Sequence, residues 1–183
     1  MSTENDEQLM RRVIDLRDQH AFRALADRHK SMGMTLAVRI LKDEQLAEEA
    51  LQDAFLRVWR SSHTFTFTAS FKTWFYRILY NAALTKRKRE LVHQEQAELT
   101  EDVAIMEGDS AGSRAETTEV VLKSITRLPE TQRTVLTLYY LQELSIEEIM
   151  EVTGMPNGTI KTHLFRGREK LRNDVTLKHY VSE

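Results

Sequence analysis

The sequence predicts an all-α protein built from two small helical domains that an acidic, flexible linker joins. Apolar residues recur at spacings of three and four over long stretches, which is the pattern of amphipathic helices. Only two prolines and six glycines interrupt the 183 residues, and no convincing strand pattern is present. The hydrophobic content of 41% is enough to bury one ordinary core or two small ones.

The first half of the chain is expected to form several helices. The clearest spans Glu44 to Arg60, where apolar residues make one broad stripe and polar residues occupy the other side. The Ser- and Thr-rich stretch "SSHTFTFTAS" predicts a loop before a helix from Phe71 to about Arg89. From Glu90 to Glu119 acidic residues dominate and the apolar periodicity weakens, which predicts a linker. The resulting N-terminal domain, linker and C-terminal domain occupy residues 1–89, 90–119 and 120–183.

The C-terminal domain is predicted to contain a helix-turn-helix. Ser145 and Glu148 have the spacing at which a hydroxyl and a carboxylate cap each other's backbone amides, so a helix over Ile146–Thr153 is expected. Gly154 can take the left-handed conformation that ends this helix, and a second helix then begins near Asn157. Earlier in the same domain, the expected helices are Val120–Thr126 and Glu130–Leu141.

The second helix, within "TGMPNGTIKTHLFRGREKLR", is expected to turn its apolar residues inward and a basic face outward. Such a helix either enters the major groove of DNA or belongs to an ordinary helical hairpin with a solvated charged face. For DNA reading, Arg166 suits a bidentate contact with guanine, whereas Lys161 and Arg168 suit phosphates. Phe165 or Thr162 suits the methyl group of thymine. The predicted DNA contacts on this helix are Lys161, Thr162, His163, Phe165, Arg166 and Arg168.

Composition and motifs argue against an enzyme or a metal centre. The net charge is −2, so a nucleic-acid surface has to be a local basic patch. The string "GDSAG" matches a nucleophile-elbow pattern around Ser110, but it lies in the acidic linker without the strand and helix that this motif needs. The six histidines lack metal-ligand spacing and no cysteine is present, so no catalytic residue, metal or cofactor is predicted. No signal peptide or membrane-length apolar run occurs, which favours a cytoplasmic protein without membrane insertion.

Motifs in both halves of the chain resemble one known family. "LAEEALQDAFLRVWRSSHTF" and "SFKTWFYRILYNAALTKRKRE" resemble, in order and spacing, the N-terminal domain of extracytoplasmic-function (ECF) sigma factors. "TIKTHLFRGREKL" is similar to the C-terminal domain of the same family and also to the recognition helix of LuxR-type regulators. A LuxR-type regulator would carry a domain of alternating strands and helices, which the first half lacks. The chain is therefore identified as a member of the ECF sigma factors, with an operator-binding regulator of LuxR type as the alternative.

The resemblance implies a function in transcription and three partners. These are core RNA polymerase, promoter DNA and an anti-sigma factor, with promoter recognition and strand opening at stress-responsive promoters. In the family, the polar side of the helix that matches Glu44–Arg60 docks on the clamp helices of the largest polymerase subunit. Carboxylate and amide groups suit an Arg-rich partner, but a simply solvated helix face has the same composition. The expected polymerase contacts are Glu48, Glu49, Gln52, Asp53 and Arg57.

The resemblance also implies that the loop before Phe71 captures a base of the single-stranded promoter −10 element, while the C-terminal helix reads the −35 duplex. Helical spacing makes Phe71, Trp74 and Phe75 core positions rather than stacking platforms. Many relatives have a stretch like Arg-Gly-Glu-Ser in this loop where this chain has "TFTAS", so no base preference follows. The expected −10 contacts are Phe65, Phe67, Asn81, Lys86, Arg87, Lys88 and Arg89.

The acidic linker allows two interpretations. Its carboxylates, among them Glu98, Glu101, Asp102 and Glu107, would repel duplex DNA. The linker therefore either lies in a basic channel of the polymerase, as the resemblance implies, or is a disordered spacer.

Overall fold

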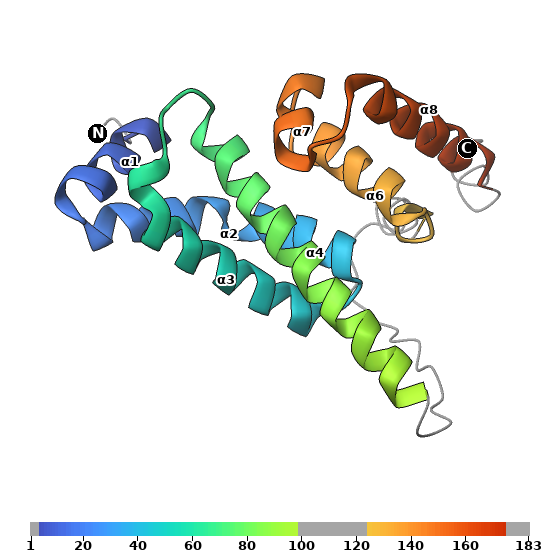
Figure 1. Ribbon diagram of the computed structural model, residues 1–183. Coiled ribbons are helices and arrows are strands. Elements are labelled where there is room, and N and C mark those ends of the chain that lie inside the picture. The colour runs from blue at the N-terminus through green and yellow to red at the C-terminus, as the bar shows by residue number, and fades with distance from the viewer. Residues whose placement is uncertain (1–3, 99–123, 175–183) are drawn as a thin grey trace, which may run out of the picture.

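The computed structural model describes residues 4–98 and 124–174, and these residues form helices and turns without any strand (Figure 1). The predicted all-α class is confirmed. The N-terminal module contains α1 (Asp6–Leu16), α2 (Gln19–Leu41), α3 (Glu44–Ser61), the 3-10 turn η1 (Ser62–Thr64) and α4 (Phe71–Glu98). The C-terminal module contains α6 (Glu130–Leu136), the π-helical turn η2 (Thr137–Leu141), α7 (Ile146–Thr153) and α8 (Asn157–Asn173).

An aromatic core joins α2, α3 and α4. The ring of Phe75 is fully buried and stacks on Phe55 and Phe71, at centroid distances of 4.9 and 6.1 Å. Helix α2 comes close to this core at Gly33, where an added Cβ would lie 2.9 Å from Cδ1 of Leu51. Phe71 and Phe75 are therefore core residues, as their spacing predicts, and together they fix the position of α4.

Helix α1 is held to α2 by a half-buried charge cluster. A carboxylate oxygen of Asp6 lies 2.7 Å from Nε2 of His29, and the other oxygen pairs with Arg28. The ring of His29 is buried and packs against Phe71 at 5.2 Å. Burial alone would raise the pKa of Asp6, but hydrogen bonds from His29 and Arg28 and their charges outweigh it, so this pKa lies below its ordinary value.

The helix-turn-helix forms as the local signals predict. The Ser145 hydroxyl accepts the Glu148 backbone N–H at 3.1 Å, and the Glu148 carboxylate accepts the Ser145 N–H at 2.9 Å. Gly154 ends α7 with a φ of 73°, the left-handed conformation that suits glycine. Helix α8 then begins at Asn157, buries Ile160, Leu164 and Gly167, and packs on α6.

Two helix boundaries differ from the sequence prediction. Helix α4 continues to Glu98 rather than ending near Arg89, because "ELVHQEQAE" contains no proline or glycine and is rich in good helix formers. The expected helix Glu130–Leu141 changes to a wider π turn over its last five residues, and the N–H of Gln142 donates to Thr137 O at 3.0 Å. Residues 124–126 are helical, but most of the linker and Ser110 lie outside the described residues.

A membrane-spanning helix is absent from the described part of the chain, since none of its helices combines sufficient length with sufficient apolar character.

Gly167→Ala should destabilise the C-terminal module. The added Cβ would lie 2.7 Å from Cδ1 of the buried Leu136, and overpacking of this kind costs about 1–3 kcal/mol, which exceeds the gain of up to about 1 kcal/mol in helix propensity. Denaturant unfolding measures the difference. Gly158→Ala is the matched control on the same helix, because an added Cβ meets nothing within 4 Å there and should be neutral or stabilising. Equal effects of the two substitutions would contradict the packing described.

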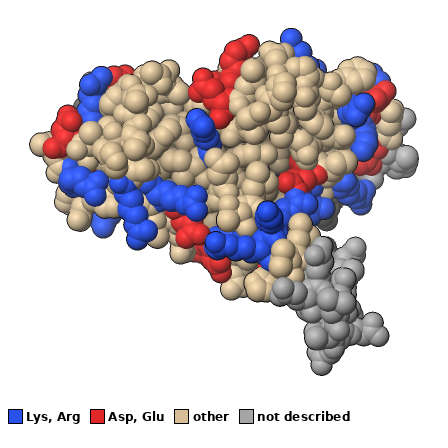
Figure 2. Space-filling view, in the orientation of Figure 1, with Lys and Arg blue, Asp and Glu red and all other residues tan. Residues whose placement is uncertain are grey.

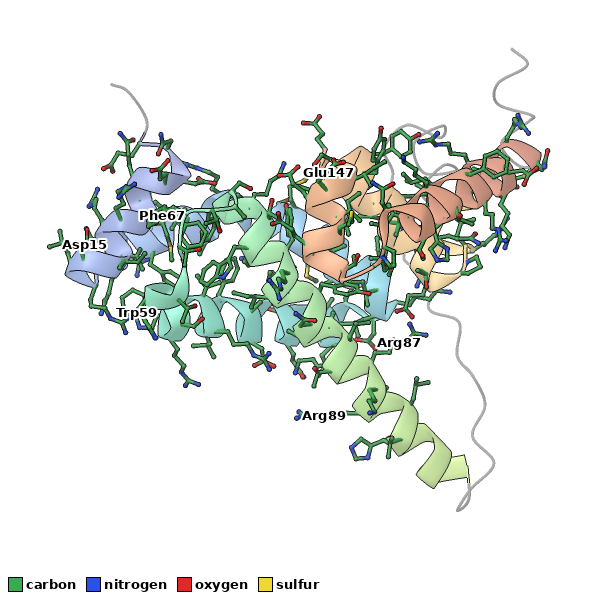
Figure 3. All side chains as sticks on the ribbon, turned by 45° about the horizontal axis from the view of Figure 1, so that its top comes forward. Asp15, Trp59, Phe67, Arg87, Arg89 and Glu147 are labelled. Atoms are coloured by element: carbon green, nitrogen blue, oxygen red, sulfur yellow. The ribbon has the colours of Figure 1, made fainter. Side chains whose placement is uncertain are left out.

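Asp6→Asn should lower the free energy of unfolding at pH 7 by about 1–3 kcal/mol, the value of a charged hydrogen bond. Because folding lowers the pKa of Asp6, its contribution is complete above the ordinary value of 3.8 and disappears as the pH falls through the lowered value. Thermal melts of both proteins between pH 7 and pH 2 should therefore converge in acid. Asp15→Asn, at an exposed position of α1 (Figure 3), should show no such pH-dependent difference.

Candidate nucleic-acid interface

The outward face of α8 is the first candidate surface. Ile160 and Leu164 are buried, so the opposite side of the helix faces solvent. Lys161 and Arg166 are exposed there, and the ring of Phe165 is 65% exposed. An aromatic ring this exposed beside two cations fits contact with base edges and phosphates.

Of the remaining predicted contacts on α8, Thr162 and Arg168 have partners within the module. The hydroxyl of Thr162 donates to Gly158 O at 2.8 Å. His163 is half-buried, and its Nδ1 atom is buried without a hydrogen bond to any described residue. The guanidinium of Arg168 lies over Tyr139 and Tyr140, at 5.8 and 5.5 Å from the ring centroids, and is therefore directed toward η2. Five of the six predicted contacts on α8 are therefore exposed, and His163 is half-buried.

The outer face of α3 is the second candidate surface. Glu48, Glu49, Gln52 and Arg57 are exposed and Asp53 is half-buried, as expected for a face that is free to meet a partner. Leu56 lies on the same side and is 50% exposed, although it is not among the predicted polymerase contacts. In the sequence, Leu56 stands four positions after Gln52. An apolar residue at this place, on the polar side of the Glu44–Arg60 helix, is the feature that points to it. An exposed leucine within a polar face adds apolar contact area for a protein partner.

The basic residues near the end of α4 fall into two groups, those in ion pairs with other helices and those exposed to solvent. The ammonium group of Lys86 lies 3.0 Å from Glu49 and 3.1 Å from Asp53, so a predicted DNA contact joins two predicted polymerase contacts in one ion-pair cluster. Burial alone would lower the pKa of Lys86, but these hydrogen bonds outweigh it and raise the pKa. Arg87 pairs with Glu130 of α6, whereas Arg89 extends from the opposite side of α4 (Figure 3). Lys88, Arg89 and Asn81 are exposed.

The loop before α4 presents one aromatic ring and buries another. Phe65 is only 7% exposed and supports the ring of Phe67 at a centroid distance of 4.7 Å. Phe67 has a φ of 60°, which is costly for a bulky residue, and the guanidinium of Arg11 lies 4.5 Å from its ring centroid. Backbone strain of this kind gathers at functional loops. A cavity of about 450 Å³ opens beside the loop, lined in part by Asn5, Arg28, Phe67 and Phe71.

Family models match both modules. The model for sigma-70 region 2 covers residues 25–91, and the model for sigma-70 region 4 covers residues 118–171. The chain is 34% identical to the ECF RNA polymerase sigma factor SigW of Bacillus subtilis over 86% of this chain and 90% of that protein. It is 33% identical to the RNA polymerase sigma-H factor of Pseudomonas aeruginosa, over 93% and 94% of the two chains. The ECF RNA polymerase sigma-E factor of Escherichia coli is 30% identical, over 96% and 97%.

Solved structures support the same fold. The sigma factor RpoE of Bartonella quintana, solved with the anti-sigma factor NepR, superposes with a TM-score of 0.68 at 23% identity over 86% of this chain and 96% of that one. CnrH in complex with the cytosolic domain of CnrY gives 0.65 at 21% identity over 91% and 94%. Both modules are thus those of the sigma-70 class of transcription factors. Within that class, the chain belongs to the family of ECF RNA polymerase sigma factors.

Proposed function

We propose that this protein is an alternative sigma factor that binds core RNA polymerase and directs promoter recognition and strand opening at stress-responsive promoters. The observation that carries the proposal is a region 2 module with an exposed polar face on α3, followed in the same chain by a region 4 module with an exposed basic face on α8. The α3 face would bind the clamp helices of the largest polymerase subunit, and α8 would read the −35 duplex.

The −10 element would be held by the N-terminal module. Phe67 is half-buried and lines a cavity, so we assign it to the unstacked base, with Phe65 as its support. Asn81, Lys88 and Arg89 are exposed and would hold the single strand by amide and phosphate contacts. Lys86 and Arg87 already pair with carboxylates, so their role in this proposal is to position neighbouring helices.

The proposal includes an anti-sigma factor as a further partner, and it assigns no catalytic step or cofactor to this chain. One of the two solved structures named above is a complex of a sigma factor with an anti-sigma factor, which supports this choice of partner. In this proposal nucleotide addition belongs to the polymerase, and the protein acts in the cytoplasm together with it. The linker would either follow a basic channel of the polymerase or act as a spacer.

Run-off transcription on a library of promoter sequences tests the function. Core polymerase should initiate at new sites only when the protein is added. Arg166→Ala should weaken recognition by about 1–3 kcal/mol, or roughly 5- to 150-fold, because one bidentate base contact is lost. The altered preference should be confined to one position of the −35 element.

Arg172→Ala provides a matched control for this experiment. It removes the same charge from the last turn of the same helix, at an exposed position outside the predicted reading face. It should leave the sequence preference unchanged. If no start site depends on the protein while the chain still binds duplex DNA specifically, the LuxR-type regulator becomes the better account.

Substitution of Lys88 and of Lys86 should change the salt dependence of single-strand binding differently. The exposed Lys88 is assigned to a phosphate, so Lys88→Ala should reduce the slope of log affinity against log salt by about 0.7 for single-stranded DNA. The two ion pairs of the half-buried Lys86 already occupy its ammonium group, so Lys86→Ala should keep the slope and lower the melting temperature instead. Salt titrations of −10 strand binding by the polymerase complex measure both. Equal slopes for the two variants would contradict this division.

A further inference from the structure

Helix α1 lies outside the parts of the chain that the family models match. The model for sigma-70 region 2 begins at residue 25, whereas α1 spans Asp6–Leu16. The helix is nevertheless a fixed part of the N-terminal module, because Met10 and Val13 are fully buried and the Asp6 carboxylate ties it to α2. Any contact of α1 with a bound strand would therefore lie outside the matched regions.

The first turn of α1 contributes to the cavity beside the loop before α4. Asn5, Asp6 and Glu7 line this cavity of about 450 Å³ together with Phe67 and other residues of the loop. Phe67 lies beside α1 in Figure 3. A base that occupies the cavity therefore comes into contact with α1 as well as with the loop.

Arg11 of α1 contacts the aromatic ring that we assign to the base. Its guanidinium lies 4.5 Å from the ring centroid of Phe67, which is within the range of a cation–π contact. Phe67 lines the cavity and Arg11 does not, so the guanidinium covers a part of the ring outside the cavity and leaves the cavity side open. Because the φ of 60° at Phe67 is costly, a contact that holds the ring in this position stabilises the loop.

The loop has no strong cation of its own. Residues 61–70, "SSHTFTFTAS", contain neither lysine nor arginine. In Figure 2, charged side chains gather over α1 at the left end of the molecule, whereas the surface between α1 and α4 is almost free of them. Lys88 lies about 25 Å from the start of α4, since a helix rises about 1.5 Å per residue. The phosphate of a nucleotide held by the loop therefore needs a cation from a nearer position.

Three other cations lie near the loop, but each is placed differently from Arg11. Arg28 lines the cavity but is held in the ion pair that ties α1 to α2. Lys72 donates to a backbone oxygen of the C-terminal module at 2.7 Å, and Arg77 lines a separate cavity. Among the cations of the described residues, Arg11 is the one whose guanidinium lies over the Phe67 ring.

The guanidinium of Arg11 is accessible to a phosphate. The side chain is 57% exposed, and so is Glu7, its ion-pair partner at 2.7 Å. Exposed ion pairs of this kind contribute little to stability. A phosphate can therefore replace the Glu7 carboxylate without loss of the fold, and it offers the guanidinium an equally charged acceptor.

We infer that Arg11 is a further contact of the −10 strand, which holds the ring of Phe67 at the cavity and binds the phosphate of the captured nucleotide. This inference rests on the proposed function. The base stacks on the cavity side of Phe67, and the guanidinium covers the ring outside the cavity. Its N–H groups exchange Glu7 for the phosphate, so α1 belongs to the strand-binding surface.

Salt titrations of −10 strand binding by the complex with core polymerase test the phosphate contact. The probe is labelled single-stranded DNA with the −10 element taken from the run-off screen. Arg11→Ala should reduce the slope of log affinity against log salt by about 0.7, as the loss of one phosphate contact does for a single strand. The affinities of variant and wild type should therefore differ about fivefold more at about 0.1 M salt than at about 1 M salt.

Controls separate this effect from a change in the fold. Arg172→Ala removes the same charge from an exposed position of α8 and should keep the wild-type slope. The melting temperature and the −35 duplex affinity of Arg11→Ala should equal those of wild type, because the lost ion pair is exposed.

Two results would overturn the inference while the proposed function stands. One is a wild-type slope in Arg11→Ala, and the other is a loss of −35 affinity that matches the loss of −10 affinity. If the wild-type complex neither binds the −10 strand nor initiates transcription, the proposed function fails and the inference falls with it.

Arg11→Lys tests the contact with the ring. Lysine keeps the charge but lacks the planar guanidinium that stacks on aromatic faces, so the salt slope should stay as in wild type. The affinity should fall about two- to fivefold, which corresponds to an exposed cation–π contact. In a Phe67→Ala background the same change should cause no further loss. An equal loss in both backgrounds would contradict the placement of Arg11 on the ring.

Discussion

The packing of Phe75 between its neighbouring helices is the interaction on which the rest of the molecule depends. Its ring is fully buried, stacks on Phe55 and Phe71, and faces the point where Gly33 lets α2 approach. This packing fixes α4, and α4 in turn positions every candidate surface of the N-terminal module. The start of α4 anchors the loop that carries Phe67. Lys86 of α4 pairs with the acidic face of α3, and the side of α4 opposite the core packs against α7.

One carboxylate links local helix formation to the arrangement of the whole chain. Glu148 caps α7 through the N–H of Ser145 and at the same time accepts the hydroxyl of Thr73 from the other module. The residue that defines the start of the helix-turn-helix thus also belongs to the contact between the two modules. Capping needs only one of its two oxygens, so α7 can remain intact when the modules separate.

Local chemistry made much of the fold predictable. Apolar periodicity correctly predicted the buried stripe of the helix that begins at Glu44. Both ends of α7 were predictable from the capping pair Ser145 and Glu148 and from Gly154. Aromatic spacing correctly placed Phe71 and Phe75 in the core. The sequence prediction ends α4 near Arg89 because an acidic composition is typical of a linker, but the residues up to Glu98 are good helix formers and extend the helix. The ion pairs of Lys86 and the contacts of Gln142 join residues far apart in the sequence, so no local pattern announces them.

The most direct test of the account is the distance between the modules in the free protein and on a promoter. Fluorophores on Lys30→Cys and Arg172→Cys, both exposed positions outside the assigned surfaces, report this distance in a chain that has no other cysteine. In the free protein the dyes should lie within about 40 Å, as expected for a compact chain of this length. With core polymerase and promoter DNA, the separation should increase by tens of ångströms. An unchanged distance in a complex that initiates transcription would contradict the account of two modules that part to span the promoter.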